Sequence, residues 1–280
     1  MSTDQIVWLA SYPKSGNTWV RSFLTAYRSG SDFVDINALD TGHAAWRPAL
    51  DEWLGLETAD LLYAELRNML PSAYRQVACL AKQPIFLKTH DRWCLTPNGE
   101  PVFPVEATQG VIHIVRDPRD VAVSVGHHWG VGLEAAIDRL NDPDYWTALE
   151  DDNPQVPQLL SDWSTHTKSW MKSEMPSLRL RYEDIRLDPV GCFREVLGFV
   201  GWNVDEGRLK QAVKACAFER LQAQEQRTGF REKLSSATAG FFRQGQSGGW
   251  RNALSMEQVQ RVVQFHSQVM QELGYQIAVV

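Results

Sequence analysis

The stretch Trp8-Leu9-Ala10-Ser11-Tyr12-Pro13-Lys14-Ser15-Gly16-Asn17-Thr18-Trp19 decides the fold of this chain. Residues 6–10 are apolar enough for a buried strand. From Thr18 onward, apolar side chains recur at the spacing of one helix face, namely at Val20, Phe23, Leu24 and Tyr27. The pattern therefore predicts a strand, a short loop and a helix.

The loop has the residue types of an anion cradle. The amides of residues 15–18 would point off the helix N-terminus, where the helix dipole and unpaired donors favour an anion. Gly16 lets the backbone approach the anion, Lys14 adds a full charge, and the hydroxyls of Ser15 and Thr18 add donors. The loop is not the G-x-x-x-x-G-K-[ST] loop of nucleotide triphosphatases, whose lysine follows the glycines. The alternative is an ordinary strand-to-helix turn with a chance Lys-Ser-Gly.

Length and composition favour one large α/β domain over residues 1–280, although the length also permits two. A net charge of −6 offers no broad basic surface, so we expect no nucleic-acid partner. With neither a leader-like N-terminus nor an apolar run of membrane-spanning length, we expect a cytoplasmic protein without a membrane partner. The four cysteines lack C-x-x-C spacing, which favours reduced thiols over disulfides or a zinc site.

A second predicted strand, over residues 84–90, ends in the polar residues Lys88-Thr89-His90. In an open parallel sheet, ligands bind outside the carboxyl ends of the strands, which is also where Lys14 falls. A single histidine is more often structural than catalytic, but this position makes His90 a candidate general base. His127 and His128 are weaker candidates for contact with an acceptor.

A third segment, residues 110–124, predicts another strand followed by a helix. Asp117 is a natural N-cap, and Pro118 is the favoured first helical residue. Arg116 is left at the tip of the strand, and Ser124 lies two turns into the helix, where it can face the same anion. A surface ion pair is the alternative for Arg116.

The rest of the chain predicts further helices and one more strand. Helical patterns cover residues 59–70 and 74–81, with an interruption at Pro71, and residues 163–172, 188–200, 206–216 and 256–273. An alternating strand runs over residues 178–184. The glycine-rich residues 228–249 predict a lid that orders over a ligand, with a flexible surface loop as the alternative.

Four of these segments resemble the sulfotransferases that use 3′-phosphoadenosine 5′-phosphosulfate (PAPS). Residues 12–19 are similar to the family's 5′-phosphosulfate loop, and residues 88–90 to its catalytic histidine segment. Residues 116–124 resemble its 3′-phosphate element, and residues 243–252 its Arg-x-Gly-x-x-Gly-x-Trp-[Lys/Arg]-Asn segment. The family commonly has Thr in place of Asn17 and Lys in place of Gln244. The chain resembles a bacterial-like member of this sulfotransferase family that has the cytosolic-type domain.

The resemblance implies a three-layer α/β/α fold with a mostly parallel central sheet and a P-loop-like phosphosulfate-binding loop. It also implies PAPS as co-substrate, 3′-phosphoadenosine 5′-phosphate (PAP) as product, and no metal. Trp19 and Phe218 would stack on the adenine, and Tyr182 would lie beside it, although Tyr182 also suits a plain half-buried strand. The implied nucleotide-binding residues are Lys14, Ser15, Gly16, Asn17, Thr18, Trp19, Arg116, Ser124, Tyr182, Phe218, Arg243, Gln244 and Gly245.

The implied reaction is in-line transfer of a sulfuryl group to a hydroxyl or amine of a small-molecule or carrier-tethered acceptor. His90 would act as general base, Lys14 and Lys88 would stabilise charge, and Ser124 would restrain Lys14 until the acceptor arrives. A P-loop-type small-molecule or nucleoside kinase is the alternative enzyme, and a non-catalytic nucleotide-binding protein is the alternative of another class. The acceptor and the oligomeric state stay open.

Overall fold

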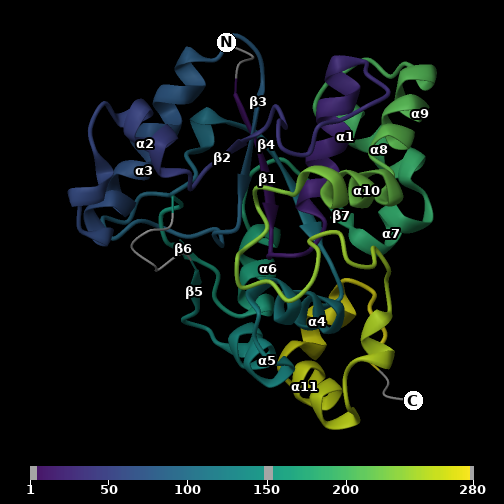
Figure 1. Ribbon diagram of the computed structural model, residues 1–280. Coiled ribbons are helices and arrows are strands. Elements are labelled where there is room, and N and C mark those ends of the chain that lie inside the picture. The colour runs from purple at the N-terminus through teal and green to yellow at the C-terminus, as the bar shows by residue number, and fades with distance from the viewer. Residues whose placement is uncertain (1–4, 148–153, 278–280) are drawn as a thin grey trace. The chain divides into compact units, whose positions relative to one another are not determined.

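A computed structural model describes residues 5–147 and 154–277 of the chain (Figure 1). The strands are β1 (Ile6–Ser11), β2 (Gly42–His43), β3 (Ile85–Thr89), β4 (Thr108–Val115), β5 (Trp146–Thr147), β6 (Gln158–Leu159) and β7 (Ser177–Arg181). The α-helices are α1 (Asn17–Ser29), α2 (Arg47–Leu54), α3 (Tyr63–Leu80), α4 (Pro118–Trp129), α5 (Leu133–Asn141), α6 (Trp163–Met171), α7 (Tyr182–Leu187), α8 (Pro189–Phe199), α9 (Glu206–Ala215), α10 (Phe218–Thr228) and α11 (Met256–Glu272). Short 3₁₀ helices are η1 (Thr58–Asp60), η2 (Val105–Ala107) and η3 (Gly249–Asn252).

A five-stranded sheet has the order β2-β3-β1-β4-β7 (Figure 1). β1 and β3 are parallel, with Ile6 opposite Ile85 and Ala10 opposite Thr89, and β2 is parallel to β3. Every residue of β1 is buried, as expected for an inner strand of a parallel sheet covered on both faces. The prediction of an α/β fold with a parallel central sheet is confirmed. The carboxyl ends of β1 and β3 share one sheet edge.

The chain divides into two compact units. The first unit comprises residues up to 12, 41–113 and 143–179, and the second comprises residues 13–40, 114–142 and 180 onward. The predicted single domain over residues 1–280 stays a prediction.

The core of the first unit packs around an aromatic cluster. The ring of Trp8 in β1 lies edge-on to those of Tyr74 and Phe103, at 4.9 Å in both cases. Its indole donates a buried 2.9 Å hydrogen bond to Oγ1 of Thr108 in β4. Each aromatic pair stabilises the fold by about 0.5–1.5 kcal/mol beyond its buried area. The cluster therefore fixes β1 against α3 and β4.

The second unit is largely helical. Phe23 of α1 stacks on Phe193 of α8 at 4.0 Å, and Tyr27 stacks on Trp202 at 6.0 Å. In another part of this unit, α4, α5 and α11 contact one another (Figure 1). As predicted, Asp117 caps α4 by accepting from the amide of Arg119 at 2.9 Å. The strand-cap-helix pattern thus fixes where α4 begins.

Two predicted boundaries were wrong. Pro71 does not divide a helix, because α3 runs through it from Tyr63 to Leu80. A proline inside a helix removes one hydrogen bond, but tertiary packing of a buried face, here including Leu70 and Tyr74, outweighs that loss. The strand predicted over residues 178–184 ends at Arg181, and the acidic residues after it lie in the first turn of α7, where the helix dipole favours them.

Two further findings concern the cysteines and the helices of the described residues. All four cysteines are free thiols. No helix in residues 5–147 or 154–277 combines the length and apolar character that crossing a bilayer requires.

Candidate active site

The loop after β1 has the geometry of an anion cradle. Gly16 is the N-cap of α1 with φ 109°, and α1 starts without a side-chain cap. A Cβ on Gly16 would lie 2.8 Å from Cδ2 of Tyr182, so both the backbone angle and the space require glycine. Ser15 is fully buried, and its hydroxyl has no hydrogen-bond partner among the described residues. A phosphate oxygen would supply that partner, so the loop fits the nucleotide implied by the sequence.

Lys14 adopts an uncommon backbone conformation for a residue with a side chain, with φ 66°. Its ammonium nitrogen lies 3.2 Å from the ring centroid of Phe241. Such cation–π contacts contribute about 0.5–1 kcal/mol at exposed sites and more when desolvated. Strained residues persist where the surroundings over-determine them, often in ligand-binding sites. Phe241, which the sequence did not single out, therefore helps to hold the predicted lysine.

Arg116 joins the loop to the glycine-rich segment. Its guanidinium donates to the carbonyl oxygen of Lys14 at 3.0 Å and to that of Gln246 at 2.8 Å. The same group lies 4.3 Å from the ring centroid of Tyr182. Arg116 is thus built into the loop, which argues against a surface ion pair as its main role.

Arg243 lies in a small hollow of the second unit. The hollow is lined by Lys14, Ser124, His127, His128, Ala237, Ala239, Gly240, Phe241 and Arg243. Burial lowers the pKa of Arg243, and the neighbouring positive charge of Arg116 lowers it further. Burial and the charge of Arg116 thus both disfavour the charge of Arg243, and a bound anion would relieve both effects.

The predicted adenine-contacting residues occupy aromatic surroundings in the same unit. Trp19 lies edge-on to Tyr182, with ring centroids 5.9 Å apart. Phe218 begins α10, and its ring covers Gly245, since a Cβ there would lie 2.3 Å from Cδ2 of Phe218. Gln244, at the position where the family often has lysine, is exposed.

Two carboxylates that the sequence analysis did not assign to the site fix the glycine-rich segment. Asp120, in the first turn of α4, accepts hydrogen bonds from the amides of Gly248 at 2.6 Å and Trp250 at 2.9 Å. Glu225 of α10 accepts from the amides of Phe241 at 2.6 Å and Phe242 at 2.9 Å. Both ends of the segment around Arg243 are therefore anchored by buried carboxylates.

His90 lies in the first unit, directly after β3. Its Nδ1 is 2.7 Å from the carbonyl oxygen of Ser11, the last residue of β1. A carbonyl only accepts, so Nδ1 carries the proton and Nε2 keeps the lone pair. Burial lowers the pKa of His90 well below its usual value, and the charge of Lys88 lowers it further. The ring is therefore neutral at pH 7, as a general base must be.

The structure thus gathers the predicted cradle residues in the second unit, while Lys88 and His90 belong to the first. Lys88 lies in β3 and is 7% exposed. His113 is buried in β4, and His166 donates from Nε2 to the carbonyl oxygen of His90 at 3.2 Å. In residues 5–147 and 154–277, no three His, Cys, Asp or Glu side chains form a group that could hold a metal ion.

The fold and these residues define a nucleotide-dependent group transferase, and comparison with known proteins gives the family. The sulfotransferase domain model matches residues 4–274. Human sulfotransferase 1C2 is 26% identical over 268 residues, covering 94% of this chain and 82% of that protein. Flavonol 3-sulfotransferase of Flaveria bidentis is 24% identical over 276 residues, covering 91% of this chain and 78% of that protein.

Solved structures share the fold. Mouse sulfotransferase SULT7A1 complexed with PAP matches with a TM-score of 0.61 at 19% identity, over 98% of this chain and 87% of that chain. Retinol dehydratase in complex with androsterone and PAP matches with a TM-score of 0.62 at 18% identity, over 99% and 83%. The chain belongs to the sulfotransferase family, and the prediction of a PAPS-dependent sulfotransferase is confirmed. The kinase alternative has no support from these relatives.

Proposed function

We propose that this chain transfers a sulfuryl group from PAPS to a hydroxyl of a small, largely apolar molecule, with an amine or a carrier-tethered hydroxyl as the alternative acceptors. The observation that carries the nucleotide assignment is Arg116, which bridges the phosphate loop and the glycine-rich segment beside Arg243. Two arginines at one place suit the 3′-phosphate that distinguishes PAPS from other adenosine nucleotides.

The binding residues divide by the part of the nucleotide that they contact. The loop residues Lys14, Ser15, Gly16, Asn17 and Thr18 hold the 5′-phosphosulfate through amides, hydroxyls and the lysine charge. Arg116, Ser124, Arg243, Gln244 and Gly245 hold the 3′-phosphate. Trp19, Tyr182 and Phe218 enclose the adenine.

His90 is the general base in this proposal. Its lowered pKa and the Ser11 carbonyl keep the ring neutral with the lone pair on Nε2, so Nε2 takes the proton of the acceptor hydroxyl as the oxygen attacks sulfur. General-base assistance of this kind is worth about 10² to 10⁴ in rate.

The lysines stabilise charge that develops during the transfer. Lys14 neutralises the bridging oxygen that leaves with PAP, and the loop amides assist it. Lys88 acts on the oxygens of the transferring sulfonate. Ser124, which lines the same hollow as Lys14, restrains the lysine until the acceptor binds. The lysines and the loop amides of this chain thus stabilise the charges that develop during the transfer, and the proposal needs no metal ion.

The choice of a small apolar acceptor rests on relatives and on the aromatic side chains Trp129, Tyr145 and Trp146, which lie in a stretch that the resemblance assigns to the acceptor site. One relative is a flavonol sulfotransferase, and a related fold binds androsterone. The relatives named here are eukaryotic and give no support to a bacterial-like assignment, which stays a prediction. A cytoplasmic location, one domain over residues 1–280 and the lack of a nucleic-acid partner are likewise parts of this proposal.

A mass-spectrometric assay tests the function. The protein is incubated with PAPS and a mixture of phenols, flavonols, steroid alcohols and aliphatic amines, and products one sulfonate heavier are sought. Parallel reactions contain ATP with Mg²⁺ in place of PAPS, or the His90→Ala variant in place of the wild-type protein. Product only with PAPS and wild-type protein supports the proposal. Product only with ATP and Mg²⁺ would establish a kinase instead.

A further inference from the structure

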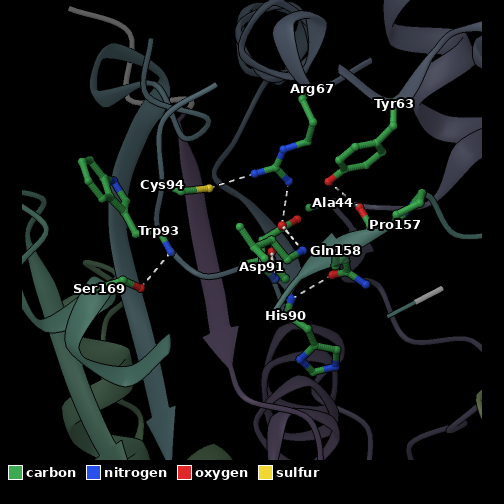
Figure 2. A network of polar contacts seen from close by, with 12 residues as sticks. Ala44, Tyr63, Arg67, His90, Asp91, Trp93, Cys94, Pro157, Gln158 and Ser169 are labelled. Atoms are coloured by element: carbon green, nitrogen blue, oxygen red, sulfur yellow. Dashed lines mark hydrogen bonds and ion pairs between the residues drawn. The ribbon is translucent and has the colours of Figure 1, made fainter. Parts of the chain in front are cut away.

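Asp91, the residue directly after His90, forms a buried ion pair with Arg67 of α3. The two side chains are 5% and 4% exposed, and Nη1 of Arg67 lies 2.7 Å from Oδ1 of Asp91. The other terminal nitrogen of Arg67 donates to Sγ of Cys94 at 2.8 Å. In Figure 2 the His90 ring points away from this pair.

Asp91 is held at four points. Besides the Arg67 contact, its Oδ1 accepts from the amide of Leu159 at 2.8 Å. Its amide donates to Oγ1 of Thr89 at 3.1 Å, and its carbonyl oxygen accepts from the Trp170 indole at 3.0 Å. A residue bonded through side chain, amide and carbonyl has almost no freedom to rotate.

The same network reaches the backbone of His90. The amide of His90 donates to Oε1 of Gln158 at 3.0 Å (Figure 2), and its carbonyl oxygen accepts from Nε2 of His166 at 3.2 Å. The 2.7 Å contact between Nδ1 and the Ser11 carbonyl then fixes the ring. Both the main chain and the side chain of His90 are therefore restrained.

Arg67 also connects this network to aromatic side chains. Its guanidinium lies 5.9 Å from the ring centroid of Tyr63 and 5.8 Å from that of Trp146. The hydroxyl of Tyr63 donates to the carbonyl oxygen of Pro157 at 3.3 Å (Figure 2). The segment 157–159, which contacts His90 and Asp91, is thus tied to α3 as well.

A buried ion pair is a poor source of net stability, because desolvation of both charges offsets their attraction, and apolar side chains of similar volume often serve as well. Its distinctive property is directional geometry. We propose that Asp91, fixed by Arg67, is a positioning residue for His90, which keeps Nε2 aimed at the acceptor. This inference rests on the proposed function, in which His90 is the base.

The test separates positioning from stability. In the Arg67→Met/Asp91→Leu double variant both charges are replaced together, so no unpaired charge is buried. Only the amide of Leu159 loses its acceptor, so the thermal midpoint should fall modestly while the protein stays folded. A misplacement of about 1 Å can cost about 10²-fold in rate, so kcat should fall about 10- to 100-fold while the Kd of PAP is unchanged. A stable double variant with kcat within twofold of wild type would overturn the proposal.

A milder variant decides the matter even if the double variant does not fold. Arg67→Lys keeps the positive charge but loses the planar fork that reaches both Asp91 and Cys94. A several-fold lower kcat at unchanged PAP affinity supports positioning, and an unchanged kcat contradicts it.

Two controls accompany these variants. Thr108→Val removes a buried hydrogen bond to Trp8 in the same unit, outside the set of contacts around Asp91, and should lower the midpoint without changing kcat. His90→Ala identifies failures of the proposed function itself: if that variant stays active, His90 is not the base. If it is inactive while the double variant is stable and fully active, only the positioning role fails.

Discussion

The two units of the chain use burial for opposite purposes. In the first unit, burial keeps His90 neutral, and a closed set of hydrogen bonds restrains its ring. In the second unit, burial and the neighbouring charge of Arg116 disfavour the charge of Arg243, which prepares the place for an anion. A base and an anion cradle therefore need different surroundings. The base must be restrained and uncharged, whereas the cradle must hold positive charge that a bound anion neutralises.

Replacing the base should give the largest effect. We expect His90→Ala to lower kcat by about 10² to 10⁴, which corresponds to about 3–5.5 kcal/mol of barrier. Nucleotide affinity should stay near wild type, because the proposed role of His90 is with the acceptor hydroxyl and not with the nucleotide. Turnover, thermal midpoint and the Kd of PAP measured on one preparation check this. A variant with normal midpoint and Kd that turns over within threefold of wild type would transfer the role to His127 or His128.

The converse substitution probes the cradle. We expect Arg243→Ala to raise the PAPS KM at least tenfold and to change kcat little, because the 3′-phosphate is remote from the reacting sulfur. The loss of one charge-assisted hydrogen bond, about 1.5–3 kcal/mol, accounts for that size. Steady-state kinetics with PAPS as the varied substrate measure it. An equal loss in kcat and kcat/KM would mean that Arg243 acts in the transition state.

Acid should destabilise the first unit through its buried histidines. Burial lowers the pKa values of His90 and His113 and brings that of His166 to about 3, all below the unfolded value of about 6.5. Their contribution to stability is therefore present above pH 6.5 and is lost as the pH falls toward the folded values. We expect up to about 1.36 kcal/mol per histidine and pH unit. Urea unfolding at pH 7, 6 and 5 checks this, and a flat profile contradicts it.

The smallest expected effect concerns Phe241, whose ring holds the Lys14 ammonium. Phe241→Leu should lower kcat two- to fivefold, the equivalent of about 0.5–1 kcal/mol for a cation–π contact. Phe241→Tyr, which keeps a ring, should stay near wild type. If both variants lose the same activity, the cation–π contact is not the reason.

Local patterns in the sequence predict the parts of the site that chain geometry alone determines. Gly16 needs a positive φ, and the Asp117 cap follows from adjacent residues, so the loop, its helix and the start of α4 were all predictable. The order of the four segments also predicted the family. The sequence pattern did not predict the single helix through Pro71, because tertiary packing of the helix outweighs the local preference of proline to end a helix.

The contacts that hold the site together were beyond such patterns. Asp120 and Gly248 are 128 residues apart, and Arg67 and Asp91 are 24 residues apart. The local sequence around one member of such a pair therefore does not indicate the other member. Asp120 resembled an ordinary acidic residue in a first helical turn, a position that the helix dipole favours anyway. Such pairs become visible only when the fold brings them together.

The most direct test of the account is whether the second unit recognises a 3′-phosphate. Isothermal titration calorimetry compares PAP with adenosine 5′-monophosphate, which differs only by lacking that group. The account predicts at least tenfold weaker binding of the monophosphate to the wild-type protein, since several charge-assisted bonds are lost. It also predicts that Arg243→Ala reduces this difference. Equal affinity of the wild-type protein for the two nucleotides would contradict the assignment of Arg116 and Arg243, and with it the proposed cradle.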